Sequence, residues 1–445
     1  MCLPYVLPMF LLTHRSPLQY VLKLYDKLKF EALCLHARNN SSLYIRPEGC
    51  YNGRQKGGGI MRNFFDELKS FFRKGDMVLL ILCLCISAFG CLIIASTNNY
   101  RDFTRYLVVQ IVAIGLGFGA YIFMSSIDLE FLSEHRVILC GFCMFLLLLL
   151  LPFGTDLNSG NKSWLDLPGI PVNIQPAEIC KIFFIIILAS VFSSHQHKIS
   201  SFRSVFHAAV YAVLIIGLNM GISKDAGVSL IFVFIFIGMA FSGGVNLLWF
   251  LGGIALLGAA MPIVWNHVMD EFQRMRFQIL WDPTIDPQGI DPRYHLVRSL
   301  KSLTGGGILG QGLFNGNRTQ AGLLPSQHTD FIFSAIGEEL GYVGCVLVLV
   351  MLFAVVARCI WVGCRSQDYK RRLVCFGAAS ALIFQIFVNV GMCMGVMPVI
   401  GLTLRLLSYG GSSTVTIYAM LGLVSGVYAR PAPRSYERYI RPPMY

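Results

Sequence analysis

The sequence predicts an all-helical protein that crosses a membrane about ten times, and three observations support this fold class. Hydrophobic residues make up 55% of the 445 residues and charged residues only 13%, about half the roughly 25% that globular proteins carry. The mean hydropathy is +0.62. Several apolar stretches approach the roughly 20 residues that a spanning helix needs. A soluble globular protein, a secreted disulfide scaffold and a disordered chain are therefore excluded.

The predicted spans follow one another from residue 77 to residue 428. In chain order they cover approximately 77–95, 106–124, 137–153, 178–194, 205–222, 226–241, 247–266, 331–356, 373–392 and 409–428. Polar or basic residues separate neighbouring spans, as Ser223, Lys224 and Asp225 do between the fifth and the sixth.

Basic residues indicate how these spans are oriented, because short cytoplasmic loops carry an excess of Lys and Arg. The relevant residues are Arg62, Lys69, Arg73 and Lys74 before the first span, Lys198 and Arg203 after the fourth, Arg358, Arg365, Lys370, Arg371 and Arg372 after the eighth, and Arg430, Arg434, Arg438 and Arg441 after the tenth. An even number of spans places all of them on one side, with both termini cytoplasmic. The segments 154–177 and 267–330 then face outward.

The remaining parts of the chain are assigned simpler roles. Residues 1–60 contain no apolar stretch long enough to span, so they are predicted to be a dispensable extension ahead of an ordinary start at Met61. Residues 61–430 form the membrane domain, and residues 431–445 form a basic cytoplasmic tail. The net charge of +12 follows from these basic connections and ends, so it does not indicate a nucleic-acid partner.

The fourteen cysteines mostly lie inside apolar stretches, where they pack as small hydrophobic residues. Cys140 and Cys143 have the C-x-x-C spacing, but no second pair and no nearby His accompanies them. Packing is therefore favoured over a metal or redox role for this pair.

Ionisable residues at membrane depth are costly, so each one is a candidate for function. Glu178 and Lys181 lie on one face of the fourth span. Either they neutralise each other as a structural pair, or Lys181 faces a cavity that holds an anionic substrate group; both interpretations remain open. Glu338 and Glu339 are neighbours in the eighth span and are predicted to form structural pairs within the bundle.

Two further carboxylates lie at the ends of predicted spans. Asp225 precedes the sixth span, where an aspartate can simply cap the helix. Asp330 stands where the long outer segment 267–330 returns to the membrane. Partial desolvation there raises the pKa of a carboxyl group and makes it a better general base. A long outer loop without structure of its own is uncommon and usually functional.

The outer loop also combines glycines with basic residues. Gly305, Gly306, Gly307, Gly310 and Gly312 would permit close approach of a ligand to the backbone, and Arg274, Arg276 and Lys301 lie nearby. The glycine spacing alone is weak evidence for phosphate binding, because no strand precedes it.

Taken together, these stretches resemble the SEDS family (shape, elongation, division and sporulation proteins), and within it the rod-shape, RodA-type branch. The resemblance covers nearly all of residues 61–430. The matching stretches are Trp164-Leu165-Asp166-Leu167, Gln175-Pro176-Ala177-Glu178 with Lys181, Lys224-Asp225-Ala226-Gly227, Gln273-Arg274-Met275-Arg276, Asp282-Pro283 with Asp286-Pro287, Gly306 to Gly312, Leu324-Pro325 with His328 to Phe333, Glu338 to Gly341, Met397 to Gly401, and Ser408 to Ser412.

The resemblance implies a peptidoglycan glycosyltransferase that polymerises lipid II at the outer face of the inner membrane during cell elongation. It implies an inverting sugar transfer from a lipid-diphosphate donor, for which Asp330 is the expected general base. The residues expected to bind substrate are Glu178, Lys181, Arg276, Asp225, Lys301 and His328. A lipid II flippase and a non-catalytic scaffold for cell-wall enzymes remain as alternatives.

The resemblance also implies partners and leaves one cofactor open. The expected partners are lipid II, the nascent glycan strand, membrane lipids and a class B penicillin-binding transpeptidase. No cofactor is certain, although a divalent cation, Mg²⁺ or Mn²⁺, would suit the diphosphate. The chain departs from the family pattern at Lys224, Thr403 and Arg405, where prolines are usual. The charge of Arg405 is expected to alter the outer mouth of the site, and Lys224 to add a cation beside Asp225.

Overall fold

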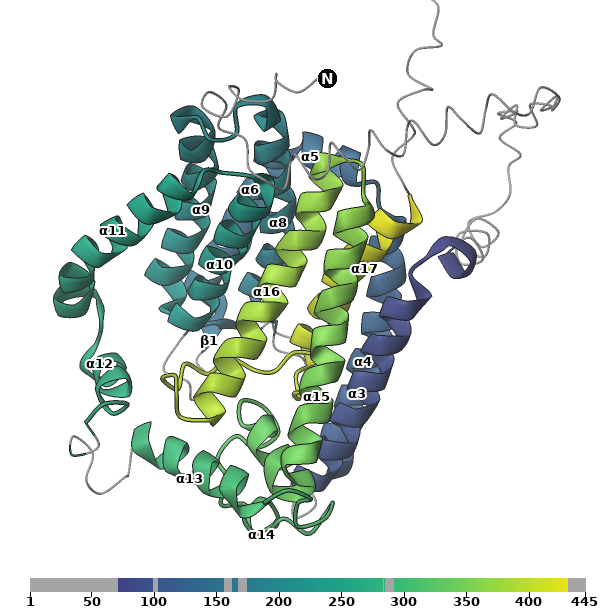
Figure 1. Cartoon of the computed structure of the whole chain (residues 1–445), viewed down its shortest axis with the longest axis vertical. Coiled ribbons are helices and arrows are strands. Elements are labelled where there is room, and N and C mark those ends of the chain that lie inside the picture. The colour runs from purple at the N-terminus through teal and green to yellow at the C-terminus, as the bar shows by residue number, and fades with distance from the viewer. Residues whose placement is uncertain are drawn as a thin grey trace, which may run out of the picture. The chain divides into compact units, whose positions relative to one another are not determined.

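The computed structural model describes residues 71–98, 103–155, 162–166, 174–282, 284 and 292–430. The predicted extension 1–60 and the predicted tail 431–445 lie outside these residues. Helices dominate the described chain (Figure 1). The longer helices are α3 (Met77–Thr97), α4 (Phe103–Ser126), α6 (Arg136–Leu148), α8 (Pro176–Ser194), α9 (Phe202–Ser223), α10 (Ala226–Gly243), α11 (Leu247–Ile263), α13 (Pro292–Gly305), α15 (Ile332–Arg365), α16 (Tyr369–Cys393) and α17 (Gly411–Ala429).

Shorter elements join the long helices. They are α5 (Leu129–Glu134), α7 (Leu150–Phe153), the strands β1 (Gly154–Thr155) and β2 (Trp164–Leu165), the 3₁₀ helix η1 (Gln196–Lys198), the π-helix η2 (Val264–Val268), α12 (Glu271–Gln278) and α14 (Asn317–Gln320). β1 and β2 pair antiparallel, with Gly154 opposite Leu165.

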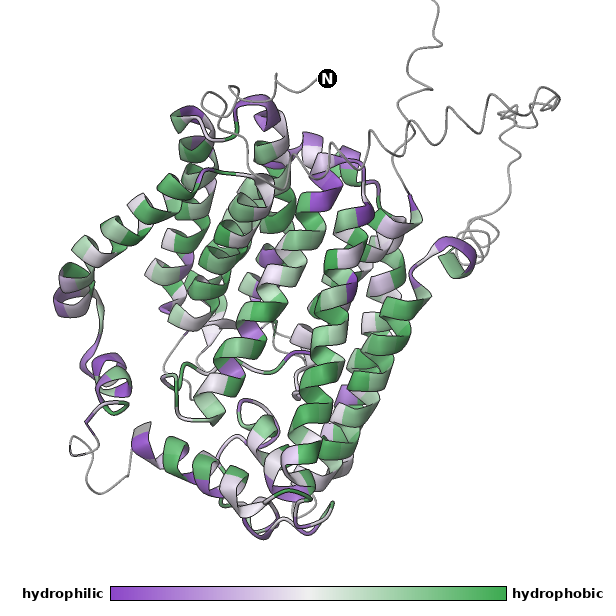
Figure 2. Ribbon diagram, viewed as in Figure 1, coloured by the Kyte–Doolittle hydropathy of each residue, from purple (hydrophilic) through white to green (hydrophobic). Residues whose placement is uncertain are grey.

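Ten helices of the described residues are long and apolar enough to cross a membrane, and each coincides with a predicted span. Apolar residues fill the middle of the bundle, and hydrophilic residues gather toward its two ends (Figure 2). The predicted multi-pass, all-helical fold class is therefore confirmed. Polar residues set several helix starts: the carboxylate of Asp76 accepts from the Leu79 N–H at 3.1 Å, and Pro176 opens α8.

The eighth span extends further than predicted. Arg358 was expected in the connection after this span, but it lies inside α15, which continues to Arg365. Its guanidinium Nε is 2.9 Å from the buried carboxylate of Asp76, and it stacks on the Trp361 ring at 4.1 Å. Because a carboxylate neutralises this arginine, its charge does not end the helix.

The degree of burial differs greatly among the spans. In the membrane-spanning part of α8, 78% of the residues are buried inside the protein, and in that of α16 72% are buried. These two helices therefore form the centre of the bundle. In α11, by contrast, none of the residues is buried. Figure 1 draws α11 at the edge of the bundle, next to α9 and α10 in the view.

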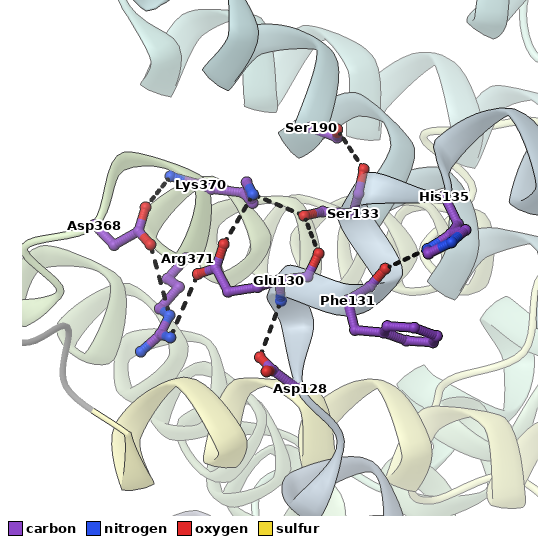
Figure 3. Close-up of polar contacts among 9 residues, drawn as sticks. All are labelled: Asp128, Glu130, Phe131, Ser133, His135, Ser190, Asp368, Lys370 and Arg371. Atoms are coloured by element: carbon purple, nitrogen blue, oxygen red, sulfur yellow. Dashed lines mark hydrogen bonds and ion pairs between the residues drawn. The ribbon is translucent and has the colours of Figure 1, made fainter. Parts of the chain in front are cut away.

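An ion-pair network ties α5 to α16 at the end of the bundle that the basic connections mark as cytoplasmic (Figure 3). The carboxylate of Glu130 contacts Lys370 Nζ at 3.0 Å and Arg371 Nη2 at 3.4 Å. Lys370 also donates to the Ser133 hydroxyl at 2.7 Å, and Ser190 of α8 donates to the Ser133 carbonyl at 2.7 Å. These predicted basic residues thus also fasten helices together.

The long outer segment is not the unstructured loop that the sequence predicted. Three helices, the longer α13 and the short α12 and α14, organise its described part. The helix α12 begins with a capping box, in which Asp270 and Gln273 satisfy each other's backbone N–H groups. Local capping signals of this kind were present in the sequence, so the segment folds instead of remaining a flexible loop.

A break in α15 at Gly341 brings the glycine-rich segment into the bundle. Gly341 has φ 68° and ψ −163°, which interrupts the helical hydrogen bonds. The freed carbonyls of Glu338 and Glu339 accept from the N–H groups of Gln311 (3.0 Å) and Gly312 (2.9 Å). On the other side of the break, the Tyr342 N–H donates to Gly307 O at 3.0 Å.

For Gly306 and Gly310, this packing corrects the prediction that the glycines let a ligand approach the backbone. A Cβ on Gly306 would lie 1.9 Å from Gly337 O, and one on Gly310 would lie 2.1 Å from Glu339 O. The space beside these two glycines is therefore filled by the backbone of α15. Their absence of a side chain serves protein packing at the break in α15.

Candidate functional site

The candidate site gathers charged side chains from five separate parts of the chain. They come from the start of α8, the start of α10, α12, the end of the outer segment before α15, and the segment 394–410 between α16 and α17. We call this last part the re-entrant segment, because Leu404 and Leu407 are fully or almost fully buried and a Cβ on Gly90 of α3 would lie 2.6 Å from Leu407 O. Irregular backbone at such depth occurs only where protein or a cavity surrounds it.

Glu178 forms the centre of a buried charge cluster. Its Oε2 lies 2.7 Å from Lys181 Nζ, and its Oε1 pairs with the guanidinium of Arg405. With its amide oxygen turned toward the cations, Gln385 of α16 accepts from Lys181 Nζ at 3.2 Å and from Arg405 Nε at 3.3 Å. The Thr416 hydroxyl lies 3.5 Å from Glu178 Oε2. The predicted structural pair of Glu178 and Lys181 is therefore present, and it includes a second cation.

Asp225 both caps α10 and faces this cluster. Its Oδ1 accepts from the Val228 N–H at 3.0 Å, as the capping interpretation predicted. Its Oδ2 accepts from Ser163 Oγ at 3.2 Å and from Gln175 Nε2 at 3.4 Å. Burial raises the pKa of Asp225, the hydrogen bonds from Val228 and Ser163 oppose that rise, and the charges of Glu178 and Lys181 also act on it.

Asp330 is half-buried where the outer segment meets α15. A Cβ on Gly401 of the re-entrant segment would lie 3.8 Å from Asp330 Oδ2, so the carboxylate points toward that segment. Burial raises the pKa of Asp330 to about 6, against the opposing effect of the positive charges of Arg405 and Arg276 and with a smaller rise due to Asp225. A carboxyl group with this pKa is largely ionised at neutral pH and still basic enough to accept a proton.

Hydrogen bonds hold the backbone around Asp330 against the re-entrant segment. The Ser408 hydroxyl donates to Thr329 O at 2.7 Å, and the Tyr409 N–H donates to His328 O at 2.8 Å. Asn389 of α16 donates from Nδ2 to Asp330 O at 2.8 Å and to Leu402 O at 2.6 Å. These bonds fix the position of the carboxylate relative to the charge cluster.

The other predicted binding residues lie at different distances from this centre. Arg276 of α12 donates from Nη1 to Val399 O at 3.0 Å, and its charge acts on Asp330. The His328 ring lies between those of Tyr106 (5.1 Å) and Tyr409 (5.7 Å). Lys301 is exposed on α13, and its described contact is made by its carbonyl, which accepts from Arg318 at 2.7 Å. No described contact brings the Lys301 side chain to the cluster.

Glu338 and Glu339 are structural, as predicted. Both are fully buried. Glu338 accepts from the Arg318 N–H at 2.7 Å and from the Thr319 hydroxyl at 2.9 Å, and Glu339 accepts from Ser96 Oγ at 2.6 Å and from Gln320 Nε2 at 2.9 Å. These hydrogen bonds attach the outer segment to α15 and α3.

The structure corrects two predictions about residues that depart from the family pattern. The charge of Arg405 was expected to alter the outer mouth of the site, but only 8% of this residue is exposed, and its guanidinium pairs with the buried Glu178. Lys224 was expected to add a cation beside Asp225, but it has φ 54° and its side chain is exposed.

Sequence analysis missed Gln385, Asn389 and the central role of Arg405. The first two are single polar residues within an apolar helix, a pattern that also fits ordinary buried hydrogen bonding. Arg405 did carry a signal, since a charge between Leu404 and Leu406 demands a buried partner.

Comparison with known proteins assigns the membrane domain to a family. Residues 76–431 match the family model FtsW/RodA/SpoVE, described as "Cell cycle protein". The peptidoglycan glycosyltransferase MrdB of Escherichia coli (strain K12) is 32% identical over 357 residues, which cover 79% of this chain and 93% of that protein.

Solved structures agree with this placement. A chain described under "Structural coordination of polymerization and crosslinking by a peptidoglycan synthase complex" superposes with a TM-score of 0.68 at 30% identity, covering 82% of this chain and 99% of that one. The rod shape determining protein RodA of Thermus thermophilus superposes with a TM-score of 0.61 at 26% identity, covering 81% and 98%. The chain described above is a multi-pass membrane protein that belongs to the FtsW/RodA/SpoVE family.

Proposed function

We propose that this protein is a peptidoglycan glycosyltransferase that polymerises lipid II into glycan strands at the outer face of the inner membrane. The observation that carries the proposal is the position of Asp330. This half-buried carboxylate has a pKa of about 6 and lies within the electrostatic reach of Arg405, Arg276 and Asp225. A base of this strength beside fixed cations suits a reaction that removes a proton and releases an anion.

In the proposed reaction, a sugar hydroxyl of the acceptor attacks the anomeric carbon of the donor. The new glycosidic bond forms as the bond between the anomeric carbon and the diphosphate oxygen breaks, which inverts the configuration. Asp330 accepts the hydroxyl proton, and the lipid diphosphate leaves as an anion. Lys181 and Arg276 supply positive charge for that anion, and Glu178 and Asp225 orient the cations.

A divalent cation, Mg²⁺ or Mn²⁺, would accompany the diphosphate of the donor and help to neutralise its charge. Among the described residues there is no group of three or more His, Cys, Asp or Glu side chains that could hold a metal ion. The role proposed for Asp330 does not depend on such an ion.

The proposal extends to a partner and to the biological process. We propose that the protein works beside a class B penicillin-binding transpeptidase, which would crosslink the strands during cell elongation. The basis is the similarity to a chain from a peptidoglycan synthase complex, described as coordinating polymerisation and crosslinking. Co-purification of the two membrane proteins from native membranes tests this association.

The deciding experiment is polymerisation of purified lipid II by the reconstituted full chain, alone and with the transpeptidase. General-base catalysis contributes typically about 10²–10⁴-fold, so Asp330→Asn is expected to abolish detectable polymerisation while lipid II binding persists. The N-cap residue of α15 is Phe331, and no side chain caps this helix. If Asp330 has only a structural role, its replacement by the similarly shaped Asn should be nearly silent. Strand synthesis near the wild-type rate by Asp330→Asn would rule out this base.

The same experiment separates the alternatives. A flippase would move fluorescent lipid II between the leaflets of a vesicle without making polymer, and a scaffold would do neither. Polymer formed by the wild-type protein, and lost in Asp330→Asn, contradicts both.

A further inference from the structure

Arg405 is a buried cation that the proposed reaction does not use directly. Its guanidinium pairs with Glu178 on α8, and its Nε donates to the Gln385 amide oxygen on α16 at 3.3 Å. It therefore joins two of the most buried helices of the bundle to the re-entrant segment on which it lies. A planar guanidinium holds its partners in directions fixed by its rigid fork of donors, whereas the donors of an ammonium rotate.

The same re-entrant segment also carries the contacts that hold the base. Three residues after Arg405, the Ser408 hydroxyl donates to Thr329 O at 2.7 Å, and the Tyr409 N–H donates to His328 O at 2.8 Å. The chain from Arg405 to Tyr409 therefore runs without interruption from the Glu178 cluster to the backbone beside Asp330. A displacement of Arg405 would move both ends of this link.

The division of Glu178 between two cations has a second consequence. Arg405 occupies Oε1, and Lys181 lies 2.7 Å from Oε2. Because Arg405 keeps Glu178 paired even when Lys181 moves away, the Lys181 ammonium can turn toward an anion without leaving a buried carboxylate unpaired. An unpaired buried charge would otherwise be strongly destabilising.

We propose that Arg405 is a positioning residue of the sugar-transfer site, which holds Glu178 and the re-entrant segment in register with Asp330 and leaves Lys181 available to the leaving diphosphate. This inference rests on the proposed function. The charge of Arg405 also favours the ionised form of Asp330. Two other charged groups act on Asp330, namely Arg276 of α12 and Asp225 at the start of α10. Two further titratable groups border it. The thiol of Cys393 on α16 lies 3.7 Å from Asp330 O, and the ring of His295 on α13 stacks on that of Phe331.

The test measures the pH dependence of lipid II polymerisation by the full chain and its Arg405 variants. In Arg405→Gln, the acid limb of the rate profile is expected to move on the order of one pH unit toward higher pH, since an adjacent arginine lowers a carboxyl pKa by about that much or more. The value of kcat should fall and KM should change little, because Arg405 orients other residues. The matched control is Arg365→Gln, which removes the same charge from an exposed position at the end of α15.

If Arg405→Gln folds poorly, Arg405→Lys tests the same inference independently. It keeps a charged partner for Glu178, so folding and the acid limb should both stay as in the wild type, while kcat falls because the two-way contact is lost. A purely structural role predicts a lower rate with an unmoved acid limb in Arg405→Gln, and that result would overturn the inference. If instead the wild-type protein makes no polymer at all, it is the proposed function that fails.

Discussion

At the scale of single residues, the environment of Asp330 predicts how activity depends on pH. Burial raises the pKa of this carboxyl group to about 6, above the ordinary value of 3.8. A general base must be ionised, so the rate should fall as the pH drops through about 6 and should be nearly constant above neutrality. Initial rates of lipid II polymerisation across this range check the prediction. A rate that stays constant well below pH 6 would contradict it.

The position of Lys181 beside Glu178 predicts how its substitution affects the rate of sugar transfer. Its ammonium should stabilise the leaving diphosphate, so Lys181→Met is expected to reduce the rate on the order of a hundredfold, which is typical for removal of one stabilising donor. Lys181→Arg should retain more activity because it keeps the charge. Both variants should fold, since Arg405 still pairs with Glu178. Equal losses in the two variants, at normal protein levels, would indicate a packing role.

The sequence predicted some of these residues and not others for a physical reason. Glu178 and Lys181 are three residues apart, so helical periodicity alone puts them on one face. Arg405 and Glu178 are separated by 227 residues, and no periodicity relates them. A charge in an apolar run shows that a partner exists, but only the fold shows which partner.

At the scale of elements, the break in α15 and the glycine-rich segment form one unit. The two backbones exchange hydrogen bonds across the break at Gly341 in place of the lost helical ones. Backbone groups at such depth need partners, so this exchange makes the break possible. The carboxylates of Glu338 and Glu339 accept further hydrogen bonds in the same region.

Two glycine substitutions test this unit. Gly310→Ala should destabilise the protein by about 3 kcal/mol or more, since strain at positive φ adds to a clash with Glu339 O. Gly307→Ala is the matched control, because Gly307 also has positive φ but nothing lies within 4 Å of its Cβ position. It should cost only about 1 kcal/mol. Thermal unfolding in detergent compares them, and similar losses in both would show that packing at the break contributes little.

Hydropathy predicted the spans well because a spanning helix is mostly apolar whether it faces lipid, as α11 does, or other helices, as α8 does. The re-entrant segment was not predicted, and its apolar residues Leu402, Leu404, Leu406 and Leu407 show why. The hydropathy of a short apolar run is the same whether the run enters a bundle as irregular backbone or continues a helix. Only the bonds to residues 328–330 distinguish the two.

At the scale of the whole molecule, the proposed site requires one orientation in the membrane. Asn317 on α14 and Gln367 between α15 and α16 are both exposed and lie at opposite ends of α15. A membrane-impermeant thiol reagent applied from outside should label Asn317→Cys and should not label Gln367→Cys. The background needs its accessible cysteines replaced by serine, and among the described residues these include Cys364, which is exposed near the end of α15.

Labelling of both positions before the membrane is permeabilised would indicate a leaky or mixed preparation and calls for sealed cells. The reverse pattern, with Gln367→Cys labelled from outside, would invert the topology and place Asp330 on the side opposite to the proposed reaction.

The exposed position of α11 also affects how freely its sequence can vary. No residue of this helix is buried, and it is apolar on every side. Lipid tails accept Leu, Ile, Val or Phe with little distinction, so exchanges among these residues should be nearly neutral along α11. The buried helix α8 offers no such freedom, since each side chain there meets fixed neighbours. In related sequences, α11 should therefore drift quickly in identity while its hydrophobic character persists, and a library of apolar substitutions should show the same contrast.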